Sequence, residues 1–393
     1  MMIIFIASSA LIAYHFLLHP ILLILLSAWI GRPAWHPASE NASLPSVTVL
    51  VPCCNEGRTI AAKADNLLAQ DYPAHRLEIV FAADGNRTDL RFWLGDRLRD
   101  PRIRAVTFPE PRGKIPVLND AVGVCRNEIL VMTDVGAQFS DGTLRALTEP
   151  FRDRTIGGVC GVHRVQCSTD ADDMGNAQRI YWQIDGWVKK AESRLGSITS
   201  SDGPIYAIRR KLYSVIPSGV TDDSYQAMAI VRRGWRFVYS DTAVAHIQPR
   251  SKSFSHEIRR RRRVVVRSVR GLWLSRALLN IRRYHLYALS LLSQKVLRRC
   301  LPLLFALVLL SSAFLGLRDE RWGILFLIQL GGYGLGLSLP LAGIPRRPGL
   351  RWAGQLQRLC GYFLAGQIGT LLGVLDFLRG RRIERWTPAR SGD

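Results

Sequence analysis

The first thirty residues hold the feature that most constrains this chain. Residues Ile3–Ile30 form one long apolar run without a charged residue, its most polar members being His15 and His19. A helix of about 20 apolar residues is enough to cross a bilayer. A cleaved signal peptide is the alternative, but no Lys or Arg precedes the run, and the run is longer than the apolar core of such a peptide. We therefore expect a retained transmembrane helix over residues 1–31.

The C-terminal third repeats the apolar character. Leu301–Leu317 and Trp322–Ile344 predict two transmembrane helices, and Leu356–Leu378, which carries Arg358 and Asp376, either spans or re-enters the membrane. Residues 300–378 thus contain two or three membrane helices. Before them, residues 272–299 mix apolar and basic side chains, which predicts an amphipathic helix lying in the membrane interface. The side on which the basic tail, residues 379–393, lies stays open.

The charge of the chain points to a membrane surface. Lys and Arg number 53 against 31 Asp and Glu, giving a net charge of +22, and the excess lies next to the apolar segments. Basic sequence beside membrane helices marks the cytoplasmic face and attracts anionic lipid. We therefore expect membrane lipids and not nucleic acid as partners. Arg32 places the following segment in the cytoplasm, which implies a multi-pass protein of the cell (inner) membrane.

A soluble domain is expected between these segments, after a Pro- and Ser-rich linker over residues 32–45. From residue 46 to 271, short apolar runs alternate with helical stretches, which predicts an α/β fold with a parallel, doubly wound sheet. The strands are expected at Val47–Val51, Leu77–Ala82, Ile103–Phe108 and Glu128–Thr133, and the helices at Gly57–Gln70 and Lys114–Arg126. Ligands of such sheets bind at the C-terminal ends of the strands, where Pro52, Asp84 and Asp134 fall.

The second part of this domain is less regular. A long helix is expected over Asp173–Arg194, with Tyr181, Trp182 and Trp187 on it. At helical spacing these aromatics are more often part of a core than a platform for a sugar, and both interpretations stay open. A further helix from Asp222 to about Arg233 precedes a strand near Arg236–Tyr239.

Five short motifs follow one another through the domain. They are Pro52-Cys53-Cys54-Asn55-Glu56, Asp84-Gly85, Gly113-Lys114 with Leu118-Asn119, Thr133-Asp134-Val135-Gly136, and Gly203-Pro204 through Arg209 with Thr221-Asp222-Asp223. In this order, between membrane segments, they resemble the processive, membrane-embedded family 2 glycosyltransferases, which include cellulose, chitin, hyaluronan and poly-N-acetylglucosamine synthases. The resemblance covers about Val47 to Leu272 and implies a GT-A-type domain.

The resemblance implies a donor site at the first four motifs. Pro52, Asn55 and Glu56 match the motif that contacts the base and ribose of a nucleotide, although Asn55 could equally be a helix N-cap. Asp84 matches a nucleobase-binding aspartate, and Gly85 would allow close backbone approach. Lys114, at a helix start, would offset diphosphate charge. Asp134 matches the first carboxylate of a D-x-D motif that holds Mg²⁺ or Mn²⁺, whereas Gly136 replaces the second.

The acceptor side is implied by the last motif and by the arginine run that follows. Gly203 begins a loop under the acceptor, Asp222 stands beside Asp223, and Asp223 matches the general base that takes the proton of an acceptor hydroxyl. Arg260 and Arg263 stand where relatives carry the Gln and Arg of Q-x-x-R-W, so Arg263 would contact the leaving diphosphate. Val264 replaces the tryptophan of that motif, which puts processivity or the acceptor contact in doubt.

These observations predict an inverting glycosyltransferase. It would move a sugar from a nucleotide-sugar donor, expected to be a UDP-sugar, to a growing polysaccharide or oligosaccharide at the cytoplasmic membrane. A glycolipid glycosyltransferase that adds one sugar to a lipid acceptor is the alternative, favoured by Gly136 and Val264. A binding subunit without activity is a more distant one. Neither the sugar, the linkage nor the oligomeric state follows from the sequence, and accessory subunits could take part.

Overall fold

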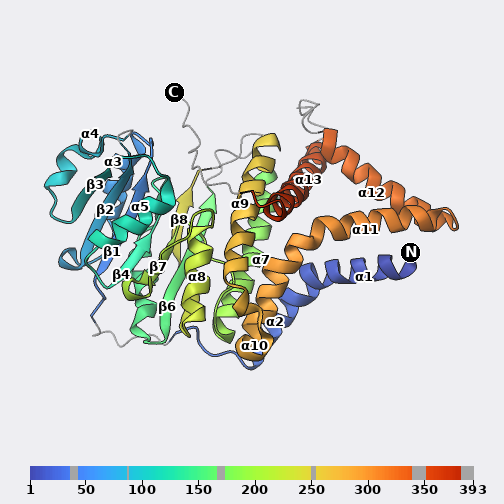
Figure 1. The fold of residues 1–393 in the computed structure, drawn as a ribbon, viewed down its shortest axis with the longest axis horizontal. Helices are drawn as coiled ribbons and strands as arrows, with labels where there is room; N and C mark the ends of the chain where they lie inside the picture. The colour runs from blue at the N-terminus through green and yellow to red at the C-terminus, as the bar shows by residue number, and fades with distance from the viewer. Residues whose placement is uncertain (36–42, 86–87, 166–172, 249–253, 339–350, 382–393) are drawn as a thin grey trace.

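The computed structural model describes residues 1–35, 43–85, 88–165, 173–248, 254–338 and 351–381. A sheet domain lies at one end, and a group of long helices projects from it (Figure 1). The sheet has eight strands in the order β3-β2-β1-β4-β7-β6-β8-β5. Their bounds are β1 Val47–Cys53, β2 Leu77–Asp84, β3 Ile103–Phe108, β4 Ile129–Met132, β5 Ala137–Phe139, β6 Ile156–Val165, β7 Tyr206–Arg209 and β8 Arg236–Ile247.

The first half of the sheet is the parallel arrangement that the sequence predicts. β1 pairs in parallel with β2 and with β4, and β2 pairs in parallel with β3. Helices α3 (Thr59–Leu68) and α5 (Lys114–Ala121) make the crossovers, and α4 (Leu90–Leu94) follows β2. Both faces of β1 and β2 are buried, so these strands are apolar almost throughout.

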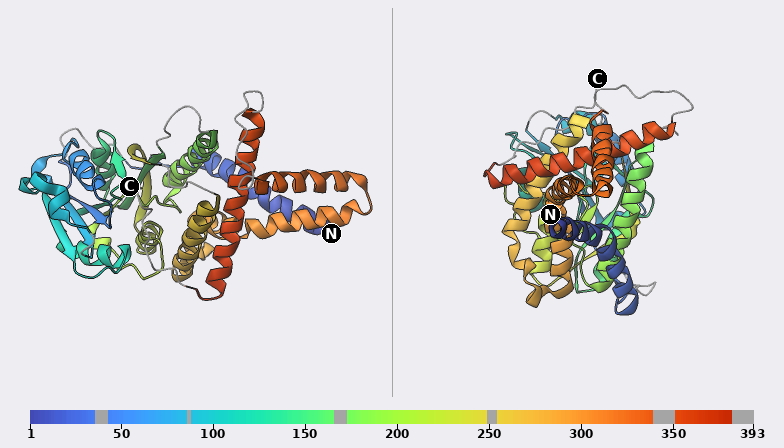
Figure 2. Two further views of the ribbon diagram at one scale, coloured as in Figure 1. Left: turned by 90° about the horizontal axis from the view of Figure 1, so that it is seen from above. Right: turned by 90° about the vertical axis from the view of Figure 1, so that its right-hand side faces the viewer.

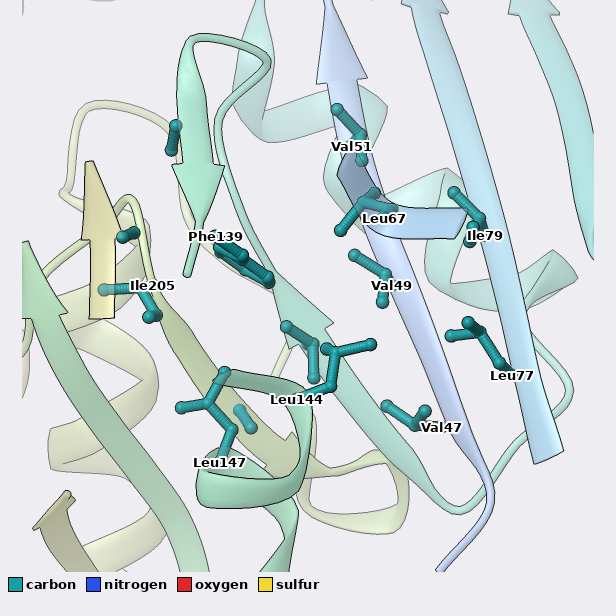
Figure 3. Close-up of a cluster of buried hydrophobic side chains, with 14 of the residues drawn as sticks. Val47, Val49, Val51, Leu67, Leu77, Ile79, Phe139, Leu144, Leu147 and Ile205 are labelled. Atoms are coloured by element: carbon teal, nitrogen blue, oxygen red, sulfur yellow. The ribbon is translucent and has the colours of Figure 1, made fainter. Parts of the chain in front are cut away.

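Alternate side chains of the strands form two separate cores. Val47, Val49 and Val51 of β1 pack with Leu67 of α3 and Leu147 of α6 (Thr143–Thr148), as Figure 3 shows. The opposite face of β1 presents Leu50 to a second core that contains residues of α5 and of α8 (Asp222–Arg232). The period of two along the strand thus sends neighbouring residues to opposite faces.

The second half of the sheet corrects the prediction of a purely parallel sheet. β7 is antiparallel to both β4 and β6, and β5 is antiparallel to β8, whereas β6 and β8 are parallel. Hydrophobic runs reveal strands but carry no information on their direction. α7 (Asp173–Leu195) contacts β8 and lies on the side of the domain that faces the projecting helices.

Three helical stretches of the described chain are long and apolar enough to cross a membrane: Met2–Trp29, Ile281–Gly316 and Gly354–Leu378. The first comprises α1 (Met2–Ala13), a π-helical turn (Tyr14–Leu18) and α2 (His19–Trp29). The predicted span Trp322–Ile344 begins as α12 (Glu320–Ser338), which is not among the three, and its last part lies outside the described residues. The basic tail lies outside them beyond residue 381.

Residues 272–299 do not form the single continuous helix that the sequence predicts. α9 (Phe254–Leu274) ends there, a 3₁₀ turn follows, and α10 (Ile281–Leu291) passes through a π-helical turn (Leu292–Leu297) into α11 (Arg298–Gly316). Asn280 caps α10 by accepting a hydrogen bond from the backbone N–H of Arg282. The location of residues 272–299 in a membrane interface stays a prediction.

The projecting helices run in two directions. α1 packs along α11, and α11 packs along α12, so these three helices extend together away from the domain. α13 (Arg351–Leu378) instead runs across α11 and α12 and along α9 (Figure 2). Glycines make its contact with α9 close: a β-carbon on Gly373 would lie 2.7 Å from Cβ of Val265. Arg262 of α9 also donates hydrogen bonds to both carboxylate oxygens of Asp376.

Candidate active site

A lysine joins two of the aspartates that the sequence singles out. Lys114 begins α5, Asp134 follows β4, and Asp222 begins α8, so three separate elements bring these side chains together. The Lys114 Nζ lies 3.0 Å from Oδ1 of Asp134 and 3.2 Å from Oδ2 of Asp222. Despite its burial, the two carboxylates raise the pKa of Lys114, so the ammonium stays charged. The predicted donor and acceptor residues therefore form one continuous electrostatic network.

Asp84 supports this lysine through the backbone. It ends β2, it is only 3% exposed, and its two carboxylate oxygens accept the N–H groups of Arg112 at 2.7 Å and Gly113 at 2.8 Å. Gly85, at φ +76°, lies against Pro111, whose N would be 2.9 Å from an added β-carbon. Asp84 thus shapes the turn that leads into α5, and a contact with a nucleobase stays a prediction.

The first motif turns away from β1 under strain. Asn55 has a φ of +62°, and its N–H donates to Oγ1 of Thr88 at 2.7 Å. It is not the N-cap of α3, because that helix begins at Thr59 after Arg58. Burial, together with the nearby charge of Asp134, raises the pKa of Glu56 to about 7. Pro52 lies within β1 itself, beside Ala82 of β2.

A buried lysine that the sequence analysis missed supports the same turn. Lys63 of α3 is fully buried, its Nζ donates to Oγ1 of Thr133 at 3.2 Å and to the carbonyl of Ala137, and burial lowers its pKa to about 7. These contacts hold both ends of the turn that carries Asp134. The signal was available, because Lys63 shares the apolar face of α3 with Ile60 and Leu67.

The acidic pair at the start of α8 is asymmetric. Asp222 is buried, contacts Lys114, and accepts a hydrogen bond from Tyr206 at 3.4 Å. Asp223 instead lines a cavity. Burial and the neighbouring charge of Asp222 raise its pKa, which suits a group that must accept a proton near neutral pH. Gly203 lies beside it, since an added β-carbon would be 3.8 Å from the Asp223 carboxyl carbon.

The cavity next to Asp223 has a volume of about 240 Å³. Residues of α7, α8, α9, α11 and α13 line it, and these elements meet where the sheet domain joins the projecting helices (Figure 1). Trp182 is part of the lining, which favours the sugar-facing role that the sequence analysis left open for it. Trp187 is 59% exposed and is not among the lining residues, and the side chain of Tyr181 lies outside the described part of the chain.

The arginine run contributes one face of α9 to this cavity. Arg260, Arg261 and Val264 line it, whereas Arg263 is not among the described lining residues. Arg260 and Arg261 both pair with the buried carboxylate of Glu257, at 2.7 and 3.1 Å. The contact of Arg263 with a leaving diphosphate therefore stays a prediction, and Arg260 is the predicted residue that lines the same cavity as Asp223.

A divalent metal fits this site only with help from a bound donor. Asp134 supplies a partly exposed carboxylate, and an added β-carbon at Gly136 would meet no atom within 4 Å, which leaves room beside it. In the described part of the chain, no group of three or more His, Cys, Asp or Glu side chains is arranged to hold a metal. Mg²⁺ and Mn²⁺ prefer oxygen ligands, and Mg²⁺ keeps several waters, so donor phosphates and water would complete the shell.

The comparison with protein families identifies the domain. The model of the family described as "Glycosyltransferase like family 2" matches residues 45–266. An N-acetylglucosaminyltransferase of Rhizobium sp. (strain N33) is 26% identical over 231 residues, which is 54% of this chain and 51% of that protein. A beta-monoglucosyldiacylglycerol synthase of Nostoc sp. (strain PCC 7120) is 25% identical over 185 residues, 46% of this chain and 39% of that protein. The matched region thus spans about half the length, or less, of these curated relatives.

A solved structure has the same fold over nearly the whole chain. The mannosyltransferase PcManGT from Pyrobaculum calidifontis, in complex with GDP-Man and Mn²⁺, superposes with a TM-score of 0.69 at 24% identity. The match covers 96% of this chain and 100% of that chain. The predicted GT-A-type domain is therefore confirmed.

Proposed function

Because this chain belongs to glycosyltransferase-like family 2, we propose that it transfers a sugar from a UDP-sugar, with inversion, to an acceptor hydroxyl at the membrane surface. The acceptor oxygen bonds to the anomeric carbon while the bond from that carbon to the diphosphate breaks. The acceptor proton passes to Asp223, and the nucleotide diphosphate leaves. No covalent intermediate on the protein is needed.

The observation that carries this proposal is the position of Asp223. Its carboxylate lines a cavity, and it follows Asp222, which Lys114 connects to Asp134 on the donor side. Its raised pKa gives it more basic strength than an ordinary carboxylate. One short network thus links the place where a diphosphate would leave to the group that would take a proton.

On the donor side we assign the binding roles to residues around Lys114. Glu56 would contact the base or ribose, Lys114 would contact the diphosphate, Asp84 would hold the preceding turn in shape, and Asp134 would hold Mg²⁺ or Mn²⁺. A bound metal would offset the negative charge of the leaving diphosphate. The Lys114 ammonium lies at the same place, where it pairs with Asp134 and Asp222, so metal binding at Asp134 would free it to contact a phosphate oxygen.

For the acceptor we propose a growing polysaccharide or oligosaccharide, in line with the relatives named N-acetylglucosaminyltransferase. Trp182, which lines the same cavity as Asp223, offers a ring on which a sugar can stack. A second candidate is transfer of one sugar to a lipid. Val264, in place of an aromatic residue, and the basic residues of the same cavity favour this candidate.

The arrangement of helices supports a place in the inner membrane. We propose that α1, α11 and α12 enter the bilayer together, with the sheet domain in the cytoplasm. α13 crosses these helices, so it would lie along the membrane surface and not span. Its Asp376, buried against Arg262 of α9, is then in the polar interface, where an ion pair is less costly than in hydrocarbon.

A donor panel tests the proposed function. The full chain, purified in detergent, would be supplied with individual nucleotide-sugars and Mg²⁺ or Mn²⁺, and nucleotide release and product size would be measured. Release from a UDP-sugar with an inverted product is the expected result. A long product would favour the polysaccharide, and one added sugar on lipid would favour the glycolipid. A retained anomeric configuration would refute the proposed single displacement.

A further inference from the structure

We propose that the cavity beside Asp223 binds a phosphate group of a membrane-anchored acceptor, with Lys295, Arg298 and Arg299 as its ligands. This inference rests on the proposed function and names the chemical class of its acceptor: a lipid that carries its sugar through a phosphate. All three basic residues line the same cavity as Asp223. They belong to one stretch of chain, at the point where the π-helical turn passes into α11.

Lys295 lies near the reacting end of this cavity. Its Nζ is 3.4 Å from Oγ of Ser224, the residue that follows Asp223, and 3.3 Å from Oγ of Ser200. It interacts electrostatically with Asp223, Arg298 and Arg299. In the described part of the chain, its polar partners are these hydroxyl groups, and no carboxylate lies within ion-pair distance. A half-buried ammonium that hydroxyl groups solvate is a suitable ligand for an anion.

The other lysine of the cavity shows the opposite pattern. Lys189 of α7 is buried, and its Nζ contacts Asp185 at 2.8 Å and Asp202 at 2.9 Å. Two carboxylates thus neutralise Lys189 within the protein. Glu192, the remaining acidic lining residue apart from Asp223, accepts hydrogen bonds from Thr199 and from Ser290, so its carboxyl group is bound within the protein. Apart from Asp223, the acidic residues of the cavity are therefore engaged with other groups of the protein and not with Lys295.

Further positive charge comes from α9. Arg260 and Arg261, which both pair with the carboxylate of Glu257, line the cavity from this helix. On the other side, Nη2 of Arg299 donates to Oγ of Ser268 of α9 at 3.1 Å, which orients its guanidinium group. Guanidinium groups bind phosphate oxygens well, because their planar donors match the spacing of those oxygens.

The first membrane helix holds this stretch in position. Nδ1 of His19 lies 3.3 Å from Nε2 of Gln294, next to Lys295, and His15 contacts the backbone of Ser293. Both histidines are almost fully buried. The two π-helical turns, Tyr14–Leu18 and Leu292–Leu297, face one another at this contact, and such turns are frequent at functional sites. The histidines of the apolar run thus act as positioning residues for Lys295.

Size and place define the acceptor further. About 240 Å³ is too small for a whole nucleotide-sugar but holds one sugar ring with an adjoining phosphate. With Asp223 and Trp182 at the sugar and Lys295 at the phosphate, the hydroxyl that attacks the donor would lie on the sugar next to the phosphate. The cavity lies where helices long enough to cross a membrane join the domain, so a lipid chain on that phosphate could remain in the bilayer.

Matched acceptors test this inference on the full chain in detergent micelles. One is N-acetylglucosamine joined to a polyprenyl chain through a diphosphate, and the second carries the same sugar and chain through a neutral ether. The third is water-soluble N-acetylglucosamine 1-phosphate. Nucleotide release would be measured with the donor that the panel above identifies. We expect a KM at least about tenfold lower for the phosphate-linked lipid than for the neutral lipid, the effect of one charged hydrogen bond.

Substitutions at Lys295 assign the effect to the cavity. Lys295→Gln should raise the KM for the phosphate-linked lipid about tenfold and leave that for the neutral lipid unchanged, while Lys295→Arg should retain the preference. Arg282→Gln is the matched control, because Arg282 is an exposed cation of the same region outside the cavity lining. Unchanged affinity for the donor nucleotide would show that each variant is folded.

Each outcome has one meaning. Equal KM values for the two lipids, or equal effects of Lys295→Gln on both, would overturn the inference while leaving the proposed function intact. The same holds if Arg282→Gln matches Lys295→Gln, because the effect would then be general surface charge. Efficient use of the soluble sugar phosphate would agree with phosphate binding in the cavity but would refute the claim that the acceptor is a lipid. No release with any donor and acceptor would refute the proposed function itself.

Discussion

Replacing Lys114 by Met should destabilise the protein substantially. The change removes the ammonium group that contacts Asp134 at 3.0 Å and Asp222 at 3.2 Å. Breaking a buried ion pair from one side costs about 3–5 kcal/mol. Because the side chains of Lys114 and Asp134 are 18% and 28% exposed, solvent screening reduces this to about 2–3 kcal/mol. For a domain of this size the melting temperature should fall by about 5–10 °C.

The assay is thermal unfolding of the purified protein in detergent, compared with Lys190→Met. Lys190 forms an ion pair of 2.8 Å with Asp241, but its side chain is 63% exposed, so its loss should have little effect. The raised pKa of Lys114 means that its contribution is complete below the ordinary lysine pKa of about 10.4 and is lost only as the pH rises beyond it. The melting temperature of Lys114→Met should therefore lie below that of Lys190→Met at both pH 6.5 and pH 8.5. The gap should be wider at pH 8.5, because Glu56, whose pKa is about 7, is then ionised and loses its interaction with the Lys114 ammonium. Equal melting temperatures for the two variants would refute the reasoning.

Two further predictions concern helix packing and pH. Gly373→Ala should lower the free energy of unfolding by about 1–3 kcal/mol, because its β-carbon would lie 2.7 Å from Val265. Gly366→Ala is the control on the same helix and should not destabilise the protein, because its β-carbon would meet no atom within 4 Å. Denaturant unfolding compares the two variants, and equal losses would contradict the close contact of α13 with α9. In the pH profile of kcat/KM, the acid limb should lie well above the ordinary aspartate pKa of about 3.9, because the raised pKa of Asp223 means that the base is lost by protonation at a higher pH. Asp222→Asn should move that limb to lower pH by removing a neighbouring negative charge, and an unchanged or higher limb would refute this coupling.

The sequence predicts the first half of the fold well for a physical reason. Strands β1, β2 and β4 are buried on both faces, so each is a continuous apolar run. β2 ends at Asp84, and Asn55 and Asp134 follow two residues after the ends of β1 and β4. β6 and β7 were missed because they lack this signal. β6 begins Ile156-Gly157-Gly158, and its glycines are needed for packing, since a β-carbon on Gly158 would lie 2.4 Å from the ring of Phe237.

The candidate site shows the same limit. The motifs single out Lys114, Asp134 and Asp222, whose side chains meet in the structure, because each lies at or next to the end of an element that the sequence reveals. Their roles stay predictions. The arginines of helix α9 are different, because the motif predicts a binding role for both Arg260 and Arg263. Which of them lines the cavity depends on how α9 is turned about its axis in the fold, and the structure places Arg260 there. Lys295 comes from a segment predicted as an interfacial helix, and its approach to Ser224 depends on tertiary packing that no local pattern records.

The most direct test of the account is the effect of Asp223→Asn on transfer and on nucleotide binding, measured in the same preparation. Asp223 lines the cavity that we assign to the acceptor, whereas we assign Lys114 and Asp134 to the donor. Loss of a base that acts on the acceptor should therefore slow the transfer step and leave nucleotide binding unchanged. The account predicts that nucleotide release with acceptor falls by about 10²–10⁴-fold while the Kd for UDP changes by less than about threefold. Retained transfer, or a loss of UDP affinity as large as that caused by Lys114→Met, would contradict the assignment of Asp223 as the base.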